Sequence, residues 1–105
     1  PFTKPVYVLI GEHTYSGGEV FALAMKSLPN AILVGEPTQG GLSDKITRTL
    51  PNGWGFSVPS EVYSDIDGNE FEDVGVPADI ESLYWQPADV RIGKDGTIER
   101  VLEEL

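Results

Sequence analysis

The spacing of hydrophobic residues changes several times along the chain, and each change marks a different element. Residues 5–10 form a nearly continuous apolar run, rich in β-branched and aromatic side chains, which is typical of a strand buried on both faces of a parallel sheet. After Glu19 the apolar residues recur at helical spacing, and Pro29 ends that pattern. Residues 31–34 form a second apolar run. A strand, a helix and a strand in this order predict a βαβ unit with parallel strands and a right-handed crossover.

The middle of the chain has the pattern of antiparallel structure. Residues 51–53 have the sequence Pro-Asn-Gly, a turn signal, and they separate two predicted strands at 44–50 and 54–58. We therefore expect a hairpin. Residues 61–64 are a candidate for a third short strand, and the polar residues 65–69 predict a turn.

The last third of the chain predicts one extended segment and two short helices. Residues 74–80 carry the last extended pattern. Pro87 can start a short helix and Gly93 can stop it. Asp95 or Thr97 can cap a final helix. The residues expected on one apolar face of that helix are Ile98, Val101, Leu102 and Leu105.

Composition narrows the functions that such a fold could carry. The 105 residues are 40% hydrophobic and 23% charged, which fits one small globular domain or a piece of a larger one. Since cysteine is absent, disulfides and thiolate metal sites are excluded. A formal net charge of −10 repels phosphate backbones and anionic lipids, so we expect no binding to nucleic acid or membrane surfaces.

The sharpest chemical motif is the segment at residues 14–19, Thr-Tyr-Ser-Gly-Gly-Glu, between the first strand and the helix. A serine at such a turn has its Oγ lifted off the sheet, and the following N–H groups point the same way. Ser16 is therefore a candidate acyl-transfer nucleophile, and the N–H of Gly17 is a candidate donor to an oxyanion. The alternative is that Ser16 only caps the helix.

Two other features have simpler interpretations. His13 is the only histidine and precedes Ser16 by three residues, so it is either a local general base or a partly exposed turn residue. The acidic run 65–72 superficially resembles a calcium loop, but glycine falls at position 4 rather than 6. A polar hairpin turn explains that run better.

Taken in order, four segments make the chain similar to the C-terminal processing peptidases, also called tail-specific proteases. They are the strand with its nucleophile turn, a Gly-rich loop, a hairpin strand and a closing segment, at residues 6–19, 34–41, 53–59 and 71–79. In the family a proline usually directly precedes the aspartate of the closing segment, whereas here it is displaced to Pro77. The resemblance implies an α/β fold of the ClpP/crotonase type and a nucleophilic role for Ser16.

The resemblance also bears on the general base. Many members use a Ser–Lys dyad, but the position of that lysine is Gly41 here, and Lys45 lies four residues later. The chain instead resembles the branch with the tricorn protease core and the interphotoreceptor retinoid-binding protein. In tricorn, a histidine from earlier in the chain serves the serine, with support from a second serine and a glutamate. Glu72 matches that glutamate, although it could equally be a solvated turn charge.

These points together predict the C-terminal part of a catalytic domain over residues 1–105, with a βαβ unit, a β-hairpin region and a C-terminal helix. The resemblance implies a serine endopeptidase that acts through an acyl-enzyme on Ser16, with Gly17 and Glu72 in supporting roles. It requires no metal or organic cofactor. The family's upstream Asn-Gly-Gly segment and histidine do not occur in the sequence, so we expect the 105 residues to be inactive alone.

Partners and location follow from the same resemblance. Protein or peptide substrates, the upstream part of the same catalytic domain, and self-association through unburied apolar surface are the expected interactions. Most such bacterial proteins are exported, which predicts a periplasmic or extracellular location. The alternative function is a non-catalytic domain of the same fold that binds an apolar ligand or serves as an assembly module.

Overall fold

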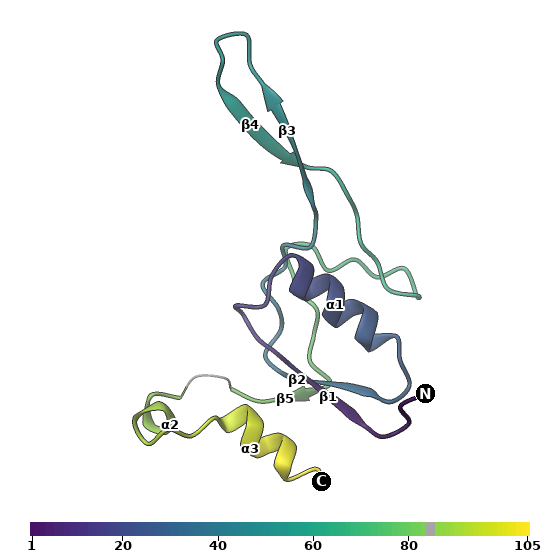
Figure 1. The fold of residues 1–105 in the computed structure, drawn as a ribbon, viewed down its shortest axis with the longest axis vertical. Helices are drawn as coiled ribbons and strands as arrows, with labels where there is room; N and C mark the ends of the chain where they lie inside the picture. Colours follow the sequence, from purple (N-terminus) through teal and green to yellow (C-terminus); the bar gives the residue numbers. More distant parts are fainter. Residues whose placement is uncertain (84–85) are drawn as a thin grey trace.

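The computed structural model describes residues 1–83 and 86–105, and it begins with the predicted βαβ unit (Figure 1). Strand β1 is Val6–Ile10, helix α1 is Gly17–Lys26, and strand β2 is Ala31–Gly35. The strands are parallel, with Val6 opposite Ala31. Helix α1 carries an acid in its first turn and Lys26 in its last, an arrangement that complements the helix dipole.

The main sheet has three parallel strands in the order β1-β2-β5, where β5 is Ile80–Glu81. Helix α1 lies over one face and helix α3, Gly96–Leu102, lies toward the other (Figure 1). The core between α1 and the sheet consists of apolar residues from five segments: Ile10, Ala22, Leu23, Leu33, Leu42 and Val76.

The prediction that the first strand is buried on both faces is wrong. Only Ile10 in β1 is buried, and Leu9 is 45% exposed. The reason is topological, because β1 is an edge strand of this sheet, and α1 and α3 each cover only part of it. The central strand β2 has the expected character, with three consecutive buried residues at its carboxyl end.

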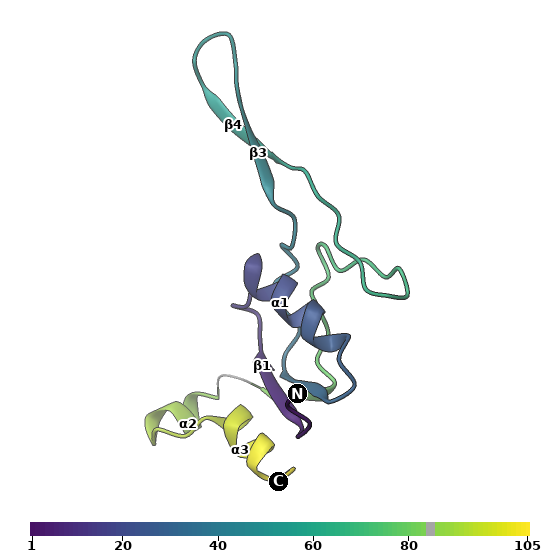
Figure 2. The same ribbon diagram turned by 45° about the vertical axis from the view of Figure 1, so that its right-hand side comes forward.

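The predicted hairpin is confirmed and projects away from the sheet in both views (Figures 1 and 2). Strand β3, Lys45–Thr49, pairs antiparallel with β4, Gly55–Pro59. The turn is closed by the N–H of Leu50, which donates to Trp54 O at 2.7 Å, and Gly53 has a positive φ of 88°. A three-residue hairpin loop with glycine in this conformation is a common solution.

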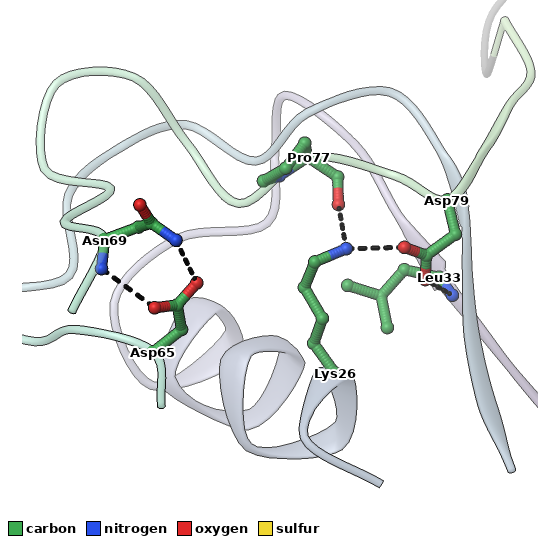
Figure 3. Close-up of polar contacts among 6 residues, drawn as sticks. All are labelled: Lys26, Leu33, Asp65, Asn69, Pro77 and Asp79. Carbon is green, nitrogen blue, oxygen red and sulfur yellow. Dashed lines mark hydrogen bonds and ion pairs between the residues drawn. The ribbon is translucent and has the colours of Figure 1, made fainter. Parts of the chain in front are cut away.

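The prediction of a third short strand at residues 61–64 is wrong. Only Ser64 joins an isolated bridge, opposite Glu70. Between them lies the predicted polar turn, in which Asp65 accepts hydrogen bonds from the side-chain amide and the N–H of Asn69 (Figure 3). These bonds, the side-chain bond first, lower the pKa of Asp65. The chain here satisfies its polar groups locally and does not need a sheet partner.

A polar strap ties the closing segment to the βαβ unit (Figure 3). Lys26 at the end of α1 forms an ion pair with Asp79, and its Nζ also donates to Pro77 O at 3.4 Å. The other carboxylate oxygen of Asp79 accepts the N–H of Leu33 at 2.9 Å. The pKa of Asp79 lies below its ordinary value. Partial burial is the largest single influence and acts to raise this pKa, but the hydrogen bonds from Lys26 and Leu33 and the positive charge on Lys26 together outweigh it.

The C-terminal region contains the two predicted helices. Helix α2, Pro87–Arg91, begins at the expected proline, and Asp95 caps α3 through bonds from the N–H groups of Thr97 and Ile98. The predicted apolar face of α3 is not buried, since Ile98 is 47% exposed and Leu102 and Leu105 are more so. Thr97 is buried instead. No helix in the described ranges is long and apolar enough to cross a bilayer.

Candidate active site

Ser16 occupies the turn that joins β1 to α1, and its backbone conformation is unusual. It is the N-cap residue of α1, with φ 53° and ψ −124°. An N-cap residue normally has an extended backbone, so capping alone does not require this conformation. A non-glycine residue held there costs about 1–3 kcal/mol, and such strain gathers at functional sites. The exposed Ser16 therefore has the geometry of a strained nucleophile turn between a strand and a helix.

The backbone N–H of Gly17 lies at the first position of the helix. In the described part of the chain it has no hydrogen-bond acceptor. A Cβ placed on Gly17 would meet no heavy atom within 4 Å, so the space beside it is open. An unpaired N–H at the positive end of a helix dipole, next to an exposed serine, is suited to bind developing negative charge.

The carboxylate of Glu19 holds this turn in place through hydrogen bonds. Its side chain is fully buried, and no cation pairs with it among the described residues. Oε2 accepts the N–H of Ser16 at 3.0 Å and that of Gly41 at 2.8 Å. Oε1 accepts the N–H of Gly40 and the hydroxyl of Thr38, both at 2.6 Å. Four donors thus compensate one buried charge, and they fix Ser16 against the loop that follows β2.

That loop is held in turn by the closing segment. The hydroxyl of Thr38, which donates to Glu19, accepts the N–H of Val76 at 2.7 Å. The N–H of Asp73 donates to Gly40 O at 2.8 Å, and the N–H of Ser16 approaches Gly41 O at 3.1 Å. The turn that holds Ser16, the Gly-rich loop and the closing segment therefore form one hydrogen-bonded network.

Glu72 lies at the far end of this network. Its Oε2 accepts the N–H groups of Leu42 and Ser43 at 3.0 and 2.9 Å. Its Oε1 accepts no hydrogen bond from the described residues. The structure thus places Glu72 beside the loop that contacts Ser16, with one carboxylate oxygen engaged and the other available.

The two base candidates inside the chain are not brought to Ser16. The His13 side chain is 78% exposed, and its nearest charged partner is Glu12 at 3.7 Å. Lys45 begins β3 and is exposed. Neither forms a hydrogen bond with Ser16 in the described ranges, so the local His–Ser dyad has no support in the geometry.

The sequence interpretation missed two residues of the site, Glu19 and Thr38. Glu19 belongs to the segment at residues 14–19, and its signal is that serine followed three residues later by glutamate is a known helix-start pattern. Thr38 gave no signal of its own. Its role arises only because parallel pairing of β1 and β2 brings their carboxyl ends to one edge of the sheet.

A pocket of about 340 Å³ opens beside the turn, at the carboxyl end of β1. Apolar Leu9 and Ile10 line it together with His13, Thr14 and the helix-capping Asp95. It adjoins the residues that lead into Ser16, and its size is adequate for a side chain of a bound peptide.

Comparison with known proteins agrees with this architecture. The sequence model of peptidase family S41 matches residues 1–82. A Chlamydia pneumoniae protein is 31% identical over 83 residues, which is 76% of this chain and 13% of that protein. A proposed peptidase from Parabacteroides merdae superposes with a TM-score of 0.86 at 27% identity, over 97% of this chain and 32% of its own.

Two further solved structures are informative. The tricorn protease is similar with a TM-score of 0.79 and 28% identity, over 95% of this chain and 10% of its own. The photosystem II D1 C-terminal processing protease has a TM-score of 0.65 and 27% identity, over 90% of this chain and 24% of its own. The resemblance inferred from the four sequence segments and the ClpP-like fold class are both confirmed. The chain spans about a third or less of each relative.

Proposed function

Because this chain belongs to peptidase family S41, we propose that it supplies the nucleophile of a serine peptidase, with Ser16 as the attacking residue. The observation that carries the proposal is the strained backbone of Ser16 next to the unpaired N–H of Gly17. A ligand-binding or scaffold domain of the same fold gives no reason to hold an exposed serine in this conformation.

In the proposed reaction, Oγ of Ser16 attacks the carbonyl carbon of a peptide bond while a base takes its proton. The carbonyl oxygen becomes an oxyanion, and the Gly17 N–H stabilises it. The C–N bond breaks, the proton passes to the leaving amine, and an ester on Ser16 remains until water hydrolyses it. Since neither His13 nor Lys45 contacts Ser16, we expect the base to come from another part of the protein. The 105 residues alone are then inactive.

We assign Glu72 a positioning role in the same proposal. Its engaged oxygen fixes the loop next to Ser16, and its available oxygen can accept a proton-bearing group that orients the base. Replacing Glu72 with glutamine should lower kcat about 10- to 100-fold with a smaller change in KM, as is typical of residues that orient a reacting group. An unchanged kcat would show that Glu72 is a structural charge in the turn with no positioning role.

The experiment uses the full-length protein and a fluorogenic peptide series. Ser16→Ala should lower kcat/KM by at least about 1,000-fold. It should change the free energy of unfolding by no more than about 1 kcal/mol, because an exposed serine makes little packing. The matched control is Ser27→Ala at the other end of α1, where Oγ only donates to Ala24 O, and its activity should stay within about twofold of wild type. Turnover by Ser16→Ala equal to wild type would refute the mechanism.

A further inference from the structure

The β3–β4 hairpin has one apolar face that nothing in the described structure covers. Residues paired directly across the hairpin have their side chains on the same face, and alternate residues share that face. One face is polar. We call the other the hairpin stripe, and it consists of Ile46, Arg48, Leu50, Trp54, Phe56 and Val58. Its five apolar members remain 39–72% exposed.

Arg48 sits in the middle of this stripe, directly opposite Phe56. Its guanidinium has only a 3.3 Å contact to Thr47 O, and no carboxylate pairs with it in the described ranges. Residues 45–60 contain Lys45 and Arg48 and no acid, within a chain of net charge −10. A cation buried under a partner without a counter-charge is costly, so the fitting partner brings a carboxylate.

The hairpin is also rooted at the candidate active site. Lys45 begins β3 shortly after Gly41, whose carbonyl faces the N–H of Ser16, and the hairpin rises from the same end of α1 (Figures 1 and 2). Each of its strands has one unpaired backbone edge, because the described sheet contains β3 and β4 alone. An extended peptide can add to such an edge and present alternate side chains to the stripe.

We propose that the hairpin stripe is a docking arm for substrate. It takes an extended apolar peptide segment that carries an acidic side chain, which pairs with Arg48. The inference rests on the proposed peptidase function for the identity of the partner as substrate. A second copy of the chain fits less well, since two stripes face to face bring no carboxylate to Arg48 and two acidic chains repel each other.

The test measures binding to full-length Ser16→Ala protein, so that it does not depend on cleavage. The probes are two labelled peptides of alternating valine and threonine, acetylated and amidated, with either glutamate or glutamine at one central valine position. The end groups leave the glutamate side chain as the only carboxylate. Fluorescence anisotropy should show the glutamate peptide binding about tenfold more tightly, a preference that weakens as salt rises.

Three variants show which hairpin residues are responsible for peptide binding. Arg48→Gln should abolish the preference for glutamate, and Phe56→Ser should weaken both peptides about equally. Thr47→Gln on the opposite face is the control and should change neither affinity. Circular dichroism checks that each variant folds.

Three results would overturn the proposal. The first is equal affinity of the protein for the two peptides. The second is a preference for the glutamate peptide that persists in Arg48→Gln. The third is a hairpin stripe that other parts of the full-length protein already cover before any peptide binds. The last is read from Trp54, by comparing acrylamide quenching of wild type with that of Trp54→Phe. Activity independent of Ser16, with the binding pattern intact, would refute the proposed function and leave the docking arm standing.

Discussion

Ser16 caps the start of α1 and Glu19 lies in its first turn, yet the two residues meet opposite environments. Ser16 is exposed and strained, whereas Glu19 is fully buried and accepts four hydrogen bonds. The buried, hydrogen-bonded Glu19 explains how Ser16 can keep its strained backbone conformation. A residue in a sparsely populated conformation needs surroundings that fix it, and Glu19 holds the N–H of Ser16 while it holds the neighbouring loop.

This account predicts a difference between two Glu→Gln changes. Glu19 uses both oxygens, so Glu19→Gln turns an NH₂ group toward N–H or O–H donors and should cost about 2–4 kcal/mol in free energy of unfolding. Glu72 uses one oxygen for both of its donors, so Glu72→Gln can keep those bonds and should cost about 1 kcal/mol or less. Urea unfolding of the full-length variants measures both values. Equal losses would show that the buried carboxylate does not organise the turn.

The sequence marks Ser16 and Gly17 as candidates through local chemistry alone, and their catalytic roles stay predictions. It could not predict the Glu19 network, because three of the four donors come from residues 38–41, far along the chain. Their approach depends on the parallel register of β1 and β2, which a local pattern does not encode.

At the scale of elements, the Gly-rich loop after β2 packs backbone to backbone against the closing segment. Gly75 has φ 82°, and a Cβ there would lie 2.0 Å from Thr38 O. Gly53 at the hairpin tip has φ 88° with no heavy atom within 4 Å of a Cβ. The two glycines therefore have similar positive φ values and differ clearly in the space around them.

Alanine at these two positions separates conformational strain from steric conflict. Gly53→Ala should cost about 1 kcal/mol, the penalty for a Cβ in this conformation. Gly75→Ala should cost at least about 2 kcal/mol more, since backbone atoms must move apart. It should also lower activity by displacing Thr38 from Glu19. Thermal or urea unfolding compares the two, and a smaller loss for Gly75→Ala than for Gly53→Ala would contradict the packing described here.

The Lys26–Asp79 strap gives the fold a dependence on pH. Because the folded-state pKa of Asp79 lies below its ordinary value, its stabilisation is present above that ordinary value and is lost as pH falls through the lowered pKa. Asp79→Asn should reduce the free energy of unfolding by about 1 kcal/mol at pH 7, and the difference from wild type should shrink toward pH 3. Urea titrations at both pH values test this. A difference that grows on acidification would refute the assignment.

Elements that depend on near neighbours were predictable, and those that depend on distant partners were not. The hairpin follows from a turn signal between two strand patterns, and it forms as expected. In the described ranges, residues 61–64 have no partner strand beyond the single Ser64–Glu70 bridge, and the apolar face of α3 has little of the chain to pack against. In both cases the sequence carries the hydrophobic pattern, but the described structure brings little or nothing to pack against it.

The whole molecule is extended for its length. Its radius of gyration is 17.0 Å, against about 13 Å for a compact chain of this size. The projecting hairpin accounts for much of the long dimension of 57 Å (Figure 1). Large side chains such as Phe21 and Trp54 are more than half exposed. This surface suits packing against other protein. Self-association, expected from the sequence, stays a prediction.

The central claim is that Ser16 is the nucleophile, and covalent labelling tests it most directly. Full-length protein is treated with a fluorophosphonate probe, and intact mass with peptide mapping locates the adduct. The account predicts one adduct, on Ser16, which disappears in Ser16→Ala and persists in Ser27→Ala. Labelling that is undiminished in Ser16→Ala, or an adduct that maps to another residue of this chain, would contradict it.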